Sequence, residues 1–468
     1  MLKLNFSKPL IKITFLFLFL SINLFLLVPL GNLLTGCNTI DPKLEPDLKL
    51  ELKDVSCTEA WLQLTTNNIQ LPASINLLTN STVAQVFNLS TQDSLLYIDS
   101  LLPNQSYKFK IVINTTNNPQ PTTNEVLAQT MDTTSHNFTW QTFTFGEHSS
   151  STLYDVAIID ENDIWAVGEI FMNDSLGNPD PTIYNAIHWD GQSWELKRIQ
   201  TLFRGNLITV PLEGIMTFSE TDIWVVGSLP IHGDGTNWTM FDVRTTVDPN
   251  LSLSKVWGSS TNNIYFVGNN GNIAHYNGSR WTKIISRVDT DLEDISGTSD
   301  GKEIWTCGWS NSTGRVSLLK IKNTYVESLW DNQTNTTLNI YRGTLLNSLY
   351  ANGNSEFVLV GGQVLRHSLF YKNQVMLEWV KTYNGSKVLE LGNYAYRIKG
   401  SNKNNIFAAG DAAMIWHFNG ATWYKYLELY GLDDRLYGLA VTDNIIVAVG
   451  KRYAPGTLGG GLLIIGRR

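Results

Sequence analysis

Asp163-Ile-Trp-Ala-Val-Gly168 is the stretch that decides the fold, because variants of it return six more times along the chain. Each copy has an acidic or amide residue, then an apolar run, then a glycine. The further copies are Asp222–Gly227, Asn263–Gly268, Glu303–Gly308, Glu356–Gly361, Asn405–Gly410 and, more loosely, Asn444–Gly450. Their glycines recur at intervals of 40 to 59 residues. A base period of about 40 residues predicts one four-stranded propeller blade per copy, hence seven blades.

A second motif, H-x-[DN]-G-x-x-W, supports the same unit. Its histidines are His188, His232, His275 and His417, and its tryptophans are Trp194, Trp238, Trp281 and Trp423. Asp-Gly and Asn-Gly favour two-residue hairpin turns, since both central residues take a positive φ. The motif therefore predicts a third strand before the turn and a fourth strand after it. The innermost strand is expected in the run before each Ile-Trp copy, such as Leu253–Gly258 or Leu292–Gly297.

The last repeat contains only three strand-like runs before the chain stops at Arg468. An unassigned run, Phe138–Phe145, lies just before the first repeat, and its Trp140 matches the tryptophan that opens the fourth strand elsewhere. We expect residues 138–145 to pair with residues 461–466. Joining the first and last segments in one sheet would close the ring and remove an open edge.

These repeats resemble bacterial propeller proteins with Asp-Ile-Trp-Ala-Val-Gly and His-Tyr-Asn-Gly signatures. Related repeats occur in two-component-regulator propellers and in assembly factors of the photosystem II type. The resemblance spans residues 138–468, with the propeller placed at 137–468. It implies the fold and says little about function, because propellers have many unrelated activities.

Residues 48–132 show alternating apolar and polar residues in short runs between Asn, Pro and Thr clusters, which predicts a small β-sandwich. The run Leu102-Pro-Asn-Gln-Ser-Tyr107 resembles the tyrosine corner of fibronectin type III domains. In that family the Tyr hydroxyl bonds to nearby backbone. Trp61 falls where the family has its core tryptophan, and Glu125–Thr130 fits the closing strand. The predicted fold class is thus all-β, a fibronectin type III-like sandwich followed by a seven-bladed propeller closed by an N-terminal strand.

The first 36 residues resemble a lipoprotein signal peptide. A basic start leads into an apolar run at residues 13–30 and then into Leu34-Thr-Gly-Cys37, which matches all four positions of the bacterial lipobox. The resemblance implies that the Cys37 thiol is acylated and anchors the mature chain in a membrane. A transmembrane anchor is the alternative, since the run nearly spans a bilayer. Residues 37–47 contain two prolines and mixed charge and are expected to be a tether.

Composition and net charge exclude one class of binding partner. The chain has a net charge of −8, and because the leader contributes three lysines and no acid, the remaining residues sum to −11. An acidic protein lacks the basic face that phosphate backbones need, so we expect no nucleic acid partner. Besides Cys37 the chain has only Cys57 and Cys307, in different expected domains. Two separate buried thiols are favoured over a disulfide.

No motif specifies catalysis, and no cofactor or metal site is expected. The four repeated histidines occupy one position on four blades, and repetition favours a structural role over a catalytic one. His136, His148 and His367 lack companions at metal-ligand spacing. The repeated aromatic residues are expected in the core rather than on a glycan-stacking surface. The acidic loop Asn173–Asp180 departs from the known calcium loop pattern.

Residues that break the repeat are better candidates for a binding site. Propellers usually bind ligands on the face with the loops from second to third strand and from blade to blade. Four candidates follow the second strands of three repeats: Phe171, Trp309, Arg452 and Tyr453. A solvated variable loop is the alternative.

We therefore expect an envelope lipoprotein, in the outer membrane and facing either the periplasm or the surface. Its propeller loop face would bind a glycan or a protein without catalysis. A polysaccharide-acting enzyme and an assembly factor or scaffold are the alternatives.

Overall fold

The computed structural model describes residues 45–115, 119–334, 345–352, 356–361, 364–368, 375–380, 394–453 and 459–468, with side chains between 352 and 393 considered only at Val358. The leader, most of the tether and Cys37 lie outside the described residues. The described part is all-β, and its longest helix, α1 (Val243–Thr246), has four residues. No helix in this part is long and apolar enough to cross a membrane.

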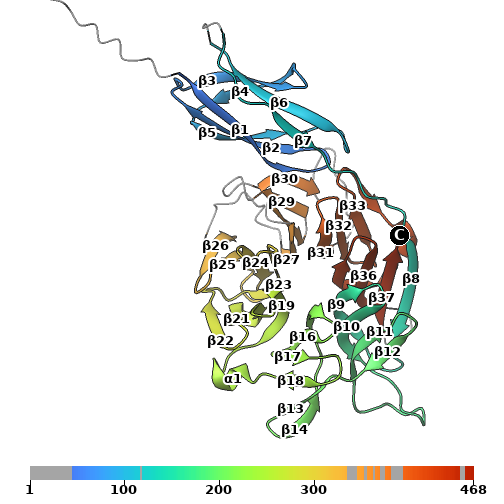
Figure 1. The fold of residues 1–468 in the computed structure, drawn as a ribbon. Coiled ribbons are helices and arrows are strands. Elements are labelled where there is room, and N and C mark those ends of the chain that lie inside the picture. Colours follow the sequence, from blue (N-terminus) through green and yellow to red (C-terminus); the bar gives the residue numbers. More distant parts are fainter. Residues whose placement is uncertain are drawn as a thin grey trace, which may run out of the picture. The chain divides into compact units, whose positions relative to one another are not determined.

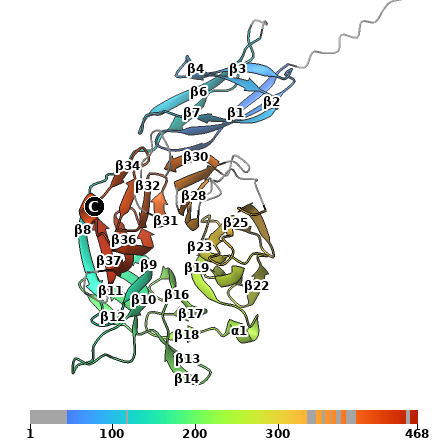
Figure 2. The ribbon, with the colours of Figure 1, turned by 180° about the vertical axis from the view of Figure 1, so that it is seen from behind.

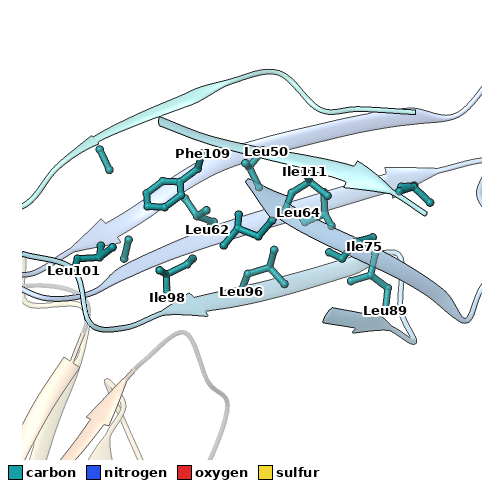
Figure 3. Close-up of a cluster of buried hydrophobic side chains, with 14 residues drawn as sticks. Leu50, Leu62, Leu64, Ile75, Leu89, Leu96, Ile98, Leu101, Phe109 and Ile111 are labelled. Atoms are coloured by element: carbon teal, nitrogen blue, oxygen red, sulfur yellow. The ribbon is translucent and has the colours of Figure 1, made fainter. Parts of the chain in front are cut away.

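Residues 47–129 form two antiparallel sheets around one core (Figure 3). The strands of the first sheet are β1 (Asp47–Val55), β2 (Ala60–Asn67) and β5 (Asp93–Ile98), in that order. Those of the second are, in spatial order, β4 (Thr82–Leu89), β3 (Ala73–Thr79), β6 (Ser106–Ile113) and β7 (Val126–Gln129). Alternation places Leu62 and Leu64 of β2 and Phe109 and Ile111 of β6 in the core, all fully buried.

The tyrosine of the expected corner forms the contact that the resemblance implies. The Tyr107 hydroxyl accepts a hydrogen bond of 2.8 Å from the backbone N–H of Leu102. Trp61 is buried, and its ring lies 5.6 Å from the ring of Tyr97. Cys57 is a free buried thiol, as is Cys307 in the later part of the chain, so the expectation of two separate thiols is confirmed.

Residues 139–467 form seven four-stranded antiparallel sheets, here called sheets 1 to 7 (Figures 1 and 2). Sheet 1 contains β9 (Thr152–Asp160), β10 (Asp163–Ile170), β11 (Tyr184–Trp189) and β12 (Trp194–Lys197). Sheet 2 contains β15 (Gly214–Ser219), β16 (Asp222–Gly227), β17 (Leu229–Gly233) and β18 (Trp238–Met240). Sheet 3 contains β19 (Leu253–Ser260), β20 (Asn263–Gly268), β21 (Asn272–Tyr276) and β22 (Trp281–Ile285). Sheet 4 contains β23 (Asp291–Gly297), β24 (Ile304–Trp309), β25 (Val316–Ile321) and β26 (Val326–Asp331); sheet 5, β27 (Leu346–Asn352), β28 (Glu356–Gly361), β29 (Val364–Ser368) and β30 (Val375–Val380). Sheet 6 contains β31 (Ala395–Asn402), β32 (Asn405–Gly410), β33 (Ile415–Phe418) and β34 (Trp423–Lys425); sheet 7, β35 (Arg435–Val441), β36 (Ile445–Arg452), β37 (Gly460–Arg467) and β8 (Thr139–Phe145).

Sheet 7 joins the two ends of this region, as expected from the sequence. Strand β8 pairs with β37 along its whole length, from Phe145 opposite Gly461 to Thr139 opposite Arg467. Trp140 lies opposite Gly466, at the register position that Trp194, Trp238, Trp281 and Trp423 occupy in other sheets. The predicted pairing of residues 138–145 with residues 461–466 is confirmed.

The first strand of each sheet lies innermost, and the seven first strands follow one another around a common centre. Each contacts the first strand of the next sheet, and β35 contacts β9, so the sheets form a ring. Apolar clusters fill the space between neighbouring sheets; one of them combines Ile164 and Ile187 of sheet 1 with Val447 and Ile465 of sheet 7. Both faces of the sheets are therefore buried, which accounts for the low charge fraction.

Candidate binding face at the loop end of the ring

The ring has two unequal ends. Connections from first to second strand and from third to fourth strand lie at one end, the turn end, and are two to six residues long among the described residues. The other end, the loop end, has the connections from second to third strand and from sheet to sheet. Of the connections whose residues are all described, the longest are residues 171–183, 198–213 and 241–252. Sequence that departs from the repeat therefore accumulates at the loop end.

A β-bulge at the loop end of each first strand is the main feature of this end. In β9, Leu153 pairs with Gly168 and Asp155 with Val167, so Tyr154 between them has no partner on β10. The same shift occurs in β19, β23, β27, β31 and β35. In sheet 2 the equivalent residue, Glu213, directly precedes β15. We call these seven residues the rim: Tyr154, Glu213, Ser254, Glu293, Asn347, Tyr396 and Tyr437.

The repeated glycine follows from this bulge. A Cβ on Gly168 would lie 2.1 Å from the carbonyl oxygen of Thr152, and one on Gly410 would lie 1.9 Å from that of Tyr394. Gly227, Gly268, Gly308 and Gly450 make equally close approaches to the preceding first strand or its connection. Only a residue without a side chain fits against the bulged backbone.

Next to the rim, two sets of charge-assisted contacts join first strands of sheets that are two places apart in the ring. Lys255 Nζ of sheet 3 lies 3.1 Å from Asp155 Oδ2 of sheet 1 and donates to the backbone oxygen of Glu213 at 2.6 Å. Asp294 Oδ2 of sheet 4 lies 2.8 Å from Lys399 Nζ of sheet 6 and accepts from the backbone N–H of Leu349 at 3.1 Å. Because both pairs are largely buried, they fix the first strands relative to one another.

Tyrosines make up one side of the rim. The rings of Tyr396 and Tyr437 are 5.7 Å apart, and those of Tyr437 and Tyr154 are 6.4 Å apart. Tyr394 extends this arc, with its ring 5.4 Å from that of Tyr396 and its hydroxyl donating to Asn347 Oδ1 at 3.0 Å. Burial raises the pKa of Tyr396 to about 12, so its phenol stays neutral and keeps its proton for hydrogen bonding.

Carboxylates make up the other side. Glu169, at the end of β10, accepts a hydrogen bond of 3.2 Å from the Tyr154 hydroxyl. Glu213 is exposed, and Glu293 is half-buried. Burial raises the pKa of Glu293, an effect opposed by the nearby charges of Arg397 and Lys255.

Exposed apolar side chains continue the face beyond the rim. The connection from sheet 6 to sheet 7, residues 426–434, includes Leu427 at 68%, Tyr430 at 51% and Leu432 at 74% exposure. The backbone of this segment is held in place, since Gly431 N–H donates to Ala412 O at 3.0 Å and Asp434 N–H donates to Gly431 O at 2.9 Å. Large apolar residues on an ordered, exposed segment are typical of a contact surface.

The structure places the four sequence candidates at the loop end but brings only two of them together. Arg452 Nε lies 3.3 Å from Asp434 Oδ2, and the Tyr453 N–H donates to Asp434 Oδ1 at 2.9 Å. Phe171 contacts the preceding connection, with its N–H donating to Ser151 Oγ at 3.0 Å, and Trp309 is half-buried against the cluster around Trp305. No contact among the described residues joins Phe171 or Trp309 to the other two. Residues 454–458, which follow Tyr453 between β36 and β37, lie outside the described residues.

The four repeated histidines make one repeated set of contacts. Nε2 of His188, His232, His275 and His417 lies 2.8 to 3.1 Å from the side-chain oxygen of the residue that opens the second strand: Asp163, Asp222, Asn263 and Asn405. Each imidazole also stacks 4.2 to 4.4 Å from the aromatic ring two residues further on: Trp165, Trp224, Tyr265 and Phe407. In sheet 5 the backbone register places Arg366 at the equivalent position, opposite Val358, and His367 lies one residue further along, opposite Phe357.

The turns of the second motif differ from the sequence prediction. Four residues, not two, separate the paired Trp189 and Trp194. The Asp190 carboxylate accepts from the N–H groups of Gln192 and Ser193, at 2.8 and 2.7 Å, and Gly191 takes a φ of +89°. The aspartate therefore caps a wider turn rather than occupying a tight one.

No family model matches the chain, and no curated protein matches it. Several solved structures do. A structure described as YCF48 bound to D1 peptide is 14% identical, with 72% of this chain and 99% of that chain covered and a TM-score of 0.50. YCF48 from Cyanidioschyzon merolae is 14% identical, covering 70% and 98%, with a TM-score of 0.49, and the Dos1 propeller is 10% identical, covering 70% and 95%, with a TM-score of 0.45. The ring has a β-propeller fold.

The rim is the part of this face that sequence reasoning missed. Its residues do not repeat, but they lie between apolar positions that do, such as Leu153 and Val156 in β9 or Leu292 and Ile295 in β23. That apolar pattern before each Ile-Trp copy was the sequence signal from which the rim positions could have been found.

Among the described residues, no group of three or more His, Cys, Asp or Glu could hold a metal ion.

Proposed function

We propose that this chain is a non-catalytic binding protein of the bacterial cell envelope, whose seven-bladed propeller presents its loop end to a protein partner. The observation that carries the proposal is the concentration there of aromatic and apolar side chains that break the repeat. Leu427, Tyr430 and Leu432 continue the face formed by the rim tyrosines. Tyrosine is enriched at protein interfaces because its ring buries a large area while its hydroxyl still bonds.

A protein partner is favoured over a glycan for two reasons. The exposed residues of the 426–434 connection include two leucines, which bury well against apolar side chains and offer no flat ring for a sugar to stack on. The structure with a TM-score of 0.50 is described as a protein with a bound peptide, which supports the proposal by analogy of fold. An assembly or scaffold role fits the same surface.

The residues before the propeller would anchor the protein in the membrane and hold this face away from it. We propose that residues 1–36 are a lipoprotein signal peptide, that Cys37 carries the lipid and that residues 37–47 are the tether. Residues 48–132 would be a fibronectin type III-like spacer. The strand order of the two sheets and the Tyr107–Leu102 hydrogen bond support the spacer assignment.

Site-specific photocrosslinking tests the binding face. A photoreactive phenylalanine analogue at Leu432, in the tagged full chain in its own cells, should give a protein adduct. The adduct should disappear when Tyr396 and Tyr437 are both changed to alanine. The analogue at Tyr325, an exposed aromatic residue in a turn-end connection, is the control and should give none. Adducts at both positions, or an adduct that survives the tyrosine changes, would contradict the proposal.

A further inference from the structure

Residues 60–92 form the longest stretch of the chain without a charged residue. They number 33, and at the overall charged fraction of 16% about five charged residues would be expected among them. The stretch contains β2, β3 and β4 of the sandwich. Burial accounts for β2 and β3, because each has a neighbouring strand on both sides and places alternate side chains in the core. It does not account for β4.

Strand β4 is an exposed edge strand. It lies at the end of its sheet and pairs only with β3. Residues 82–86 are all exposed, and the side chains of Val83 and Val86 are each 58% exposed. In an antiparallel pair only alternate residues of an edge strand bond to the neighbouring strand, so the remaining N–H and C=O groups of β4 point away from the sheet. No other described strand pairs with that edge.

A β-bulge at Ala84 shapes this edge. Ala84 has no partner on β3, because the pairing register shifts there. The shift puts Val83 and Val86 on the same outer face of the sheet, since their partners on β3 alternate with the buried Ile75 and Leu77. The five residues that follow Ala84 pair regularly with β3. The free edge is therefore a regular run of five residues, with two outward-facing valines beside it.

The other edge strands of the sandwich have features that keep foreign strands away. Strand β1 contains Lys49, Glu51 and Lys53, β5 begins with Asp93, and β7 has only four residues. Charged side chains and short length are common protections of a sheet edge. Strand β4 has eight residues and no charge. An uncharged edge of this length on an otherwise protected domain is typical of a strand that pairs with another chain.

We propose that β4 pairs antiparallel with β4 of a second copy of this chain, so that the two four-stranded sheets join into one. A two-fold axis brings the same edge from both sides, and each free N–H of one copy then meets a C=O of the other. The outer valines of the two copies would lie side by side across the junction. The inference concerns a different surface from the loop end and does not rest on the proposed function.

Charge favours a second copy as the occupant of this edge. Residues 37–468 sum to a net charge of −11, so two copies repel each other wherever their acidic surfaces come close. Strand β4 is an edge at which they can meet without that repulsion. Its side chains offer a strand of another protein no charge to recognise, whereas an identical uncharged strand matches it in length and backbone pattern.

Photocrosslinking in the cells that make the protein tests this inference. Two full-length copies with different tags are expressed together, one of them with a photoreactive phenylalanine analogue at Val86. We expect an adduct that contains two chains and carries both tags. The analogue at Leu127, an exposed residue of the edge strand at the other end of the same sheet, is the matched control and should give no such adduct.

A charge placed on the edge gives a second readout. Val83→Lys in both copies should lower the yield of the two-tag adduct at least about tenfold, because each copy then brings a like charge to the junction. Val83→Thr, which stays β-branched and uncharged, should leave the yield unchanged. Because Val83 is exposed, neither change should alter the urea unfolding transition.

Several results would overturn the inference. These are no adduct at Val86, an adduct with another protein in place of the second copy, or two-tag adducts of equal yield at Val86 and Leu127. A yield that Val83→Lys leaves unchanged would also overturn it. So would a ladder of adducts with three or more chains, because each copy has only one β4 and a two-fold pair is closed.

Discussion

Lys255 and Asp155 form an ion pair with 3.1 Å between Nζ and Oδ2, although their strands belong to sheets 3 and 1, with sheet 2 between them in the ring. Both side chains are largely buried, and Lys255 reaches across sheet 2 at Gly214, which has no side chain in the way. The pair therefore depends on the ring being assembled.

Asp155→Ala should destabilise the ring strongly, because it leaves a buried ammonium without its carboxylate. A loss of about 3 to 5 kcal/mol is expected for breaking such a pair. The double variant Asp155→Ala/Lys255→Met should recover most of this loss, since no charge stays buried. Urea unfolding followed by tryptophan fluorescence measures both. Equal loss in the single and double variants would mean that packing, not charge, holds this site.

Replacing the repeated glycine, even by alanine, should lower the unfolding free energy. Gly410→Ala would place a Cβ 1.9 Å from the carbonyl oxygen of Tyr394, so we expect a loss of about 2 kcal/mol or more in unfolding free energy. Gly314→Ala is the control. Gly314 has open space around it and a φ of +65°, so only backbone strain of about 1 kcal/mol is expected there. A harmless Gly410→Ala would refute the close-approach explanation.

The stability of the protein should fall at acidic pH because His417 is held in its neutral form in the folded state. Burial, with His136 and Arg468 nearby, lowers the pKa of His417 to about 3, whereas the unfolded chain has a value of about 6.5. The unfolded state therefore takes up the proton first, and the stability that the neutral imidazole supplies is complete above about pH 6.5 and is lost as the pH falls toward 3. Urea midpoints across this window measure it.

The matching variant is His417→Phe, which keeps an aromatic ring against Phe407. It also removes the contact of 2.8 Å between His417 Nδ1 and His136 Nδ1. We expect it to flatten the acid limb of the stability profile. An unchanged acid limb would assign the pH dependence to other groups.

The tyrosine corner can be tested by removing one oxygen. Tyr107→Phe deletes the acceptor for the Leu102 N–H while keeping the ring, so a loss of about 1 kcal/mol is expected. Tyr325→Phe, at an exposed position, should leave the unfolding transition unchanged. A neutral Tyr107→Phe would show that the hydroxyl contributes nothing to the sandwich.

Acylation of the lipobox cysteine is open to direct labelling. Cys37→Ser should abolish incorporation of a labelled fatty acid and release the chain from membranes, because the acyl chains supply about 0.8 kcal/mol per buried methylene. Cys57→Ser, at a buried thiol, is the control and should retain the label. Label that persists in Cys37→Ser would exclude this residue as the anchor.

The sequence by itself predicted the repeated strands, the number of repeats and the pairing of residues 138–145 with residues 461–466. These features depend on local alternation and on glycines such as Gly168, whose close approach recurs in six of the seven sheets, so they are visible as repetition. The sequence also located the loop end, where Arg452 and Tyr453 share Asp434.

Only the tertiary structure decided which residues form the proposed binding face. Tyr154, Glu213 and Tyr437 lie far apart in the chain and in unrelated local sequence, and none belongs to a repeated motif. They meet because a bulge recurs at one position of each first strand and because contact between β35 and β9 brings those positions around one centre. A periodic sequence pattern reveals the residues that all the sheets share. The proposed face consists of residues that differ from sheet to sheet, and these residues come together only when the ring forms.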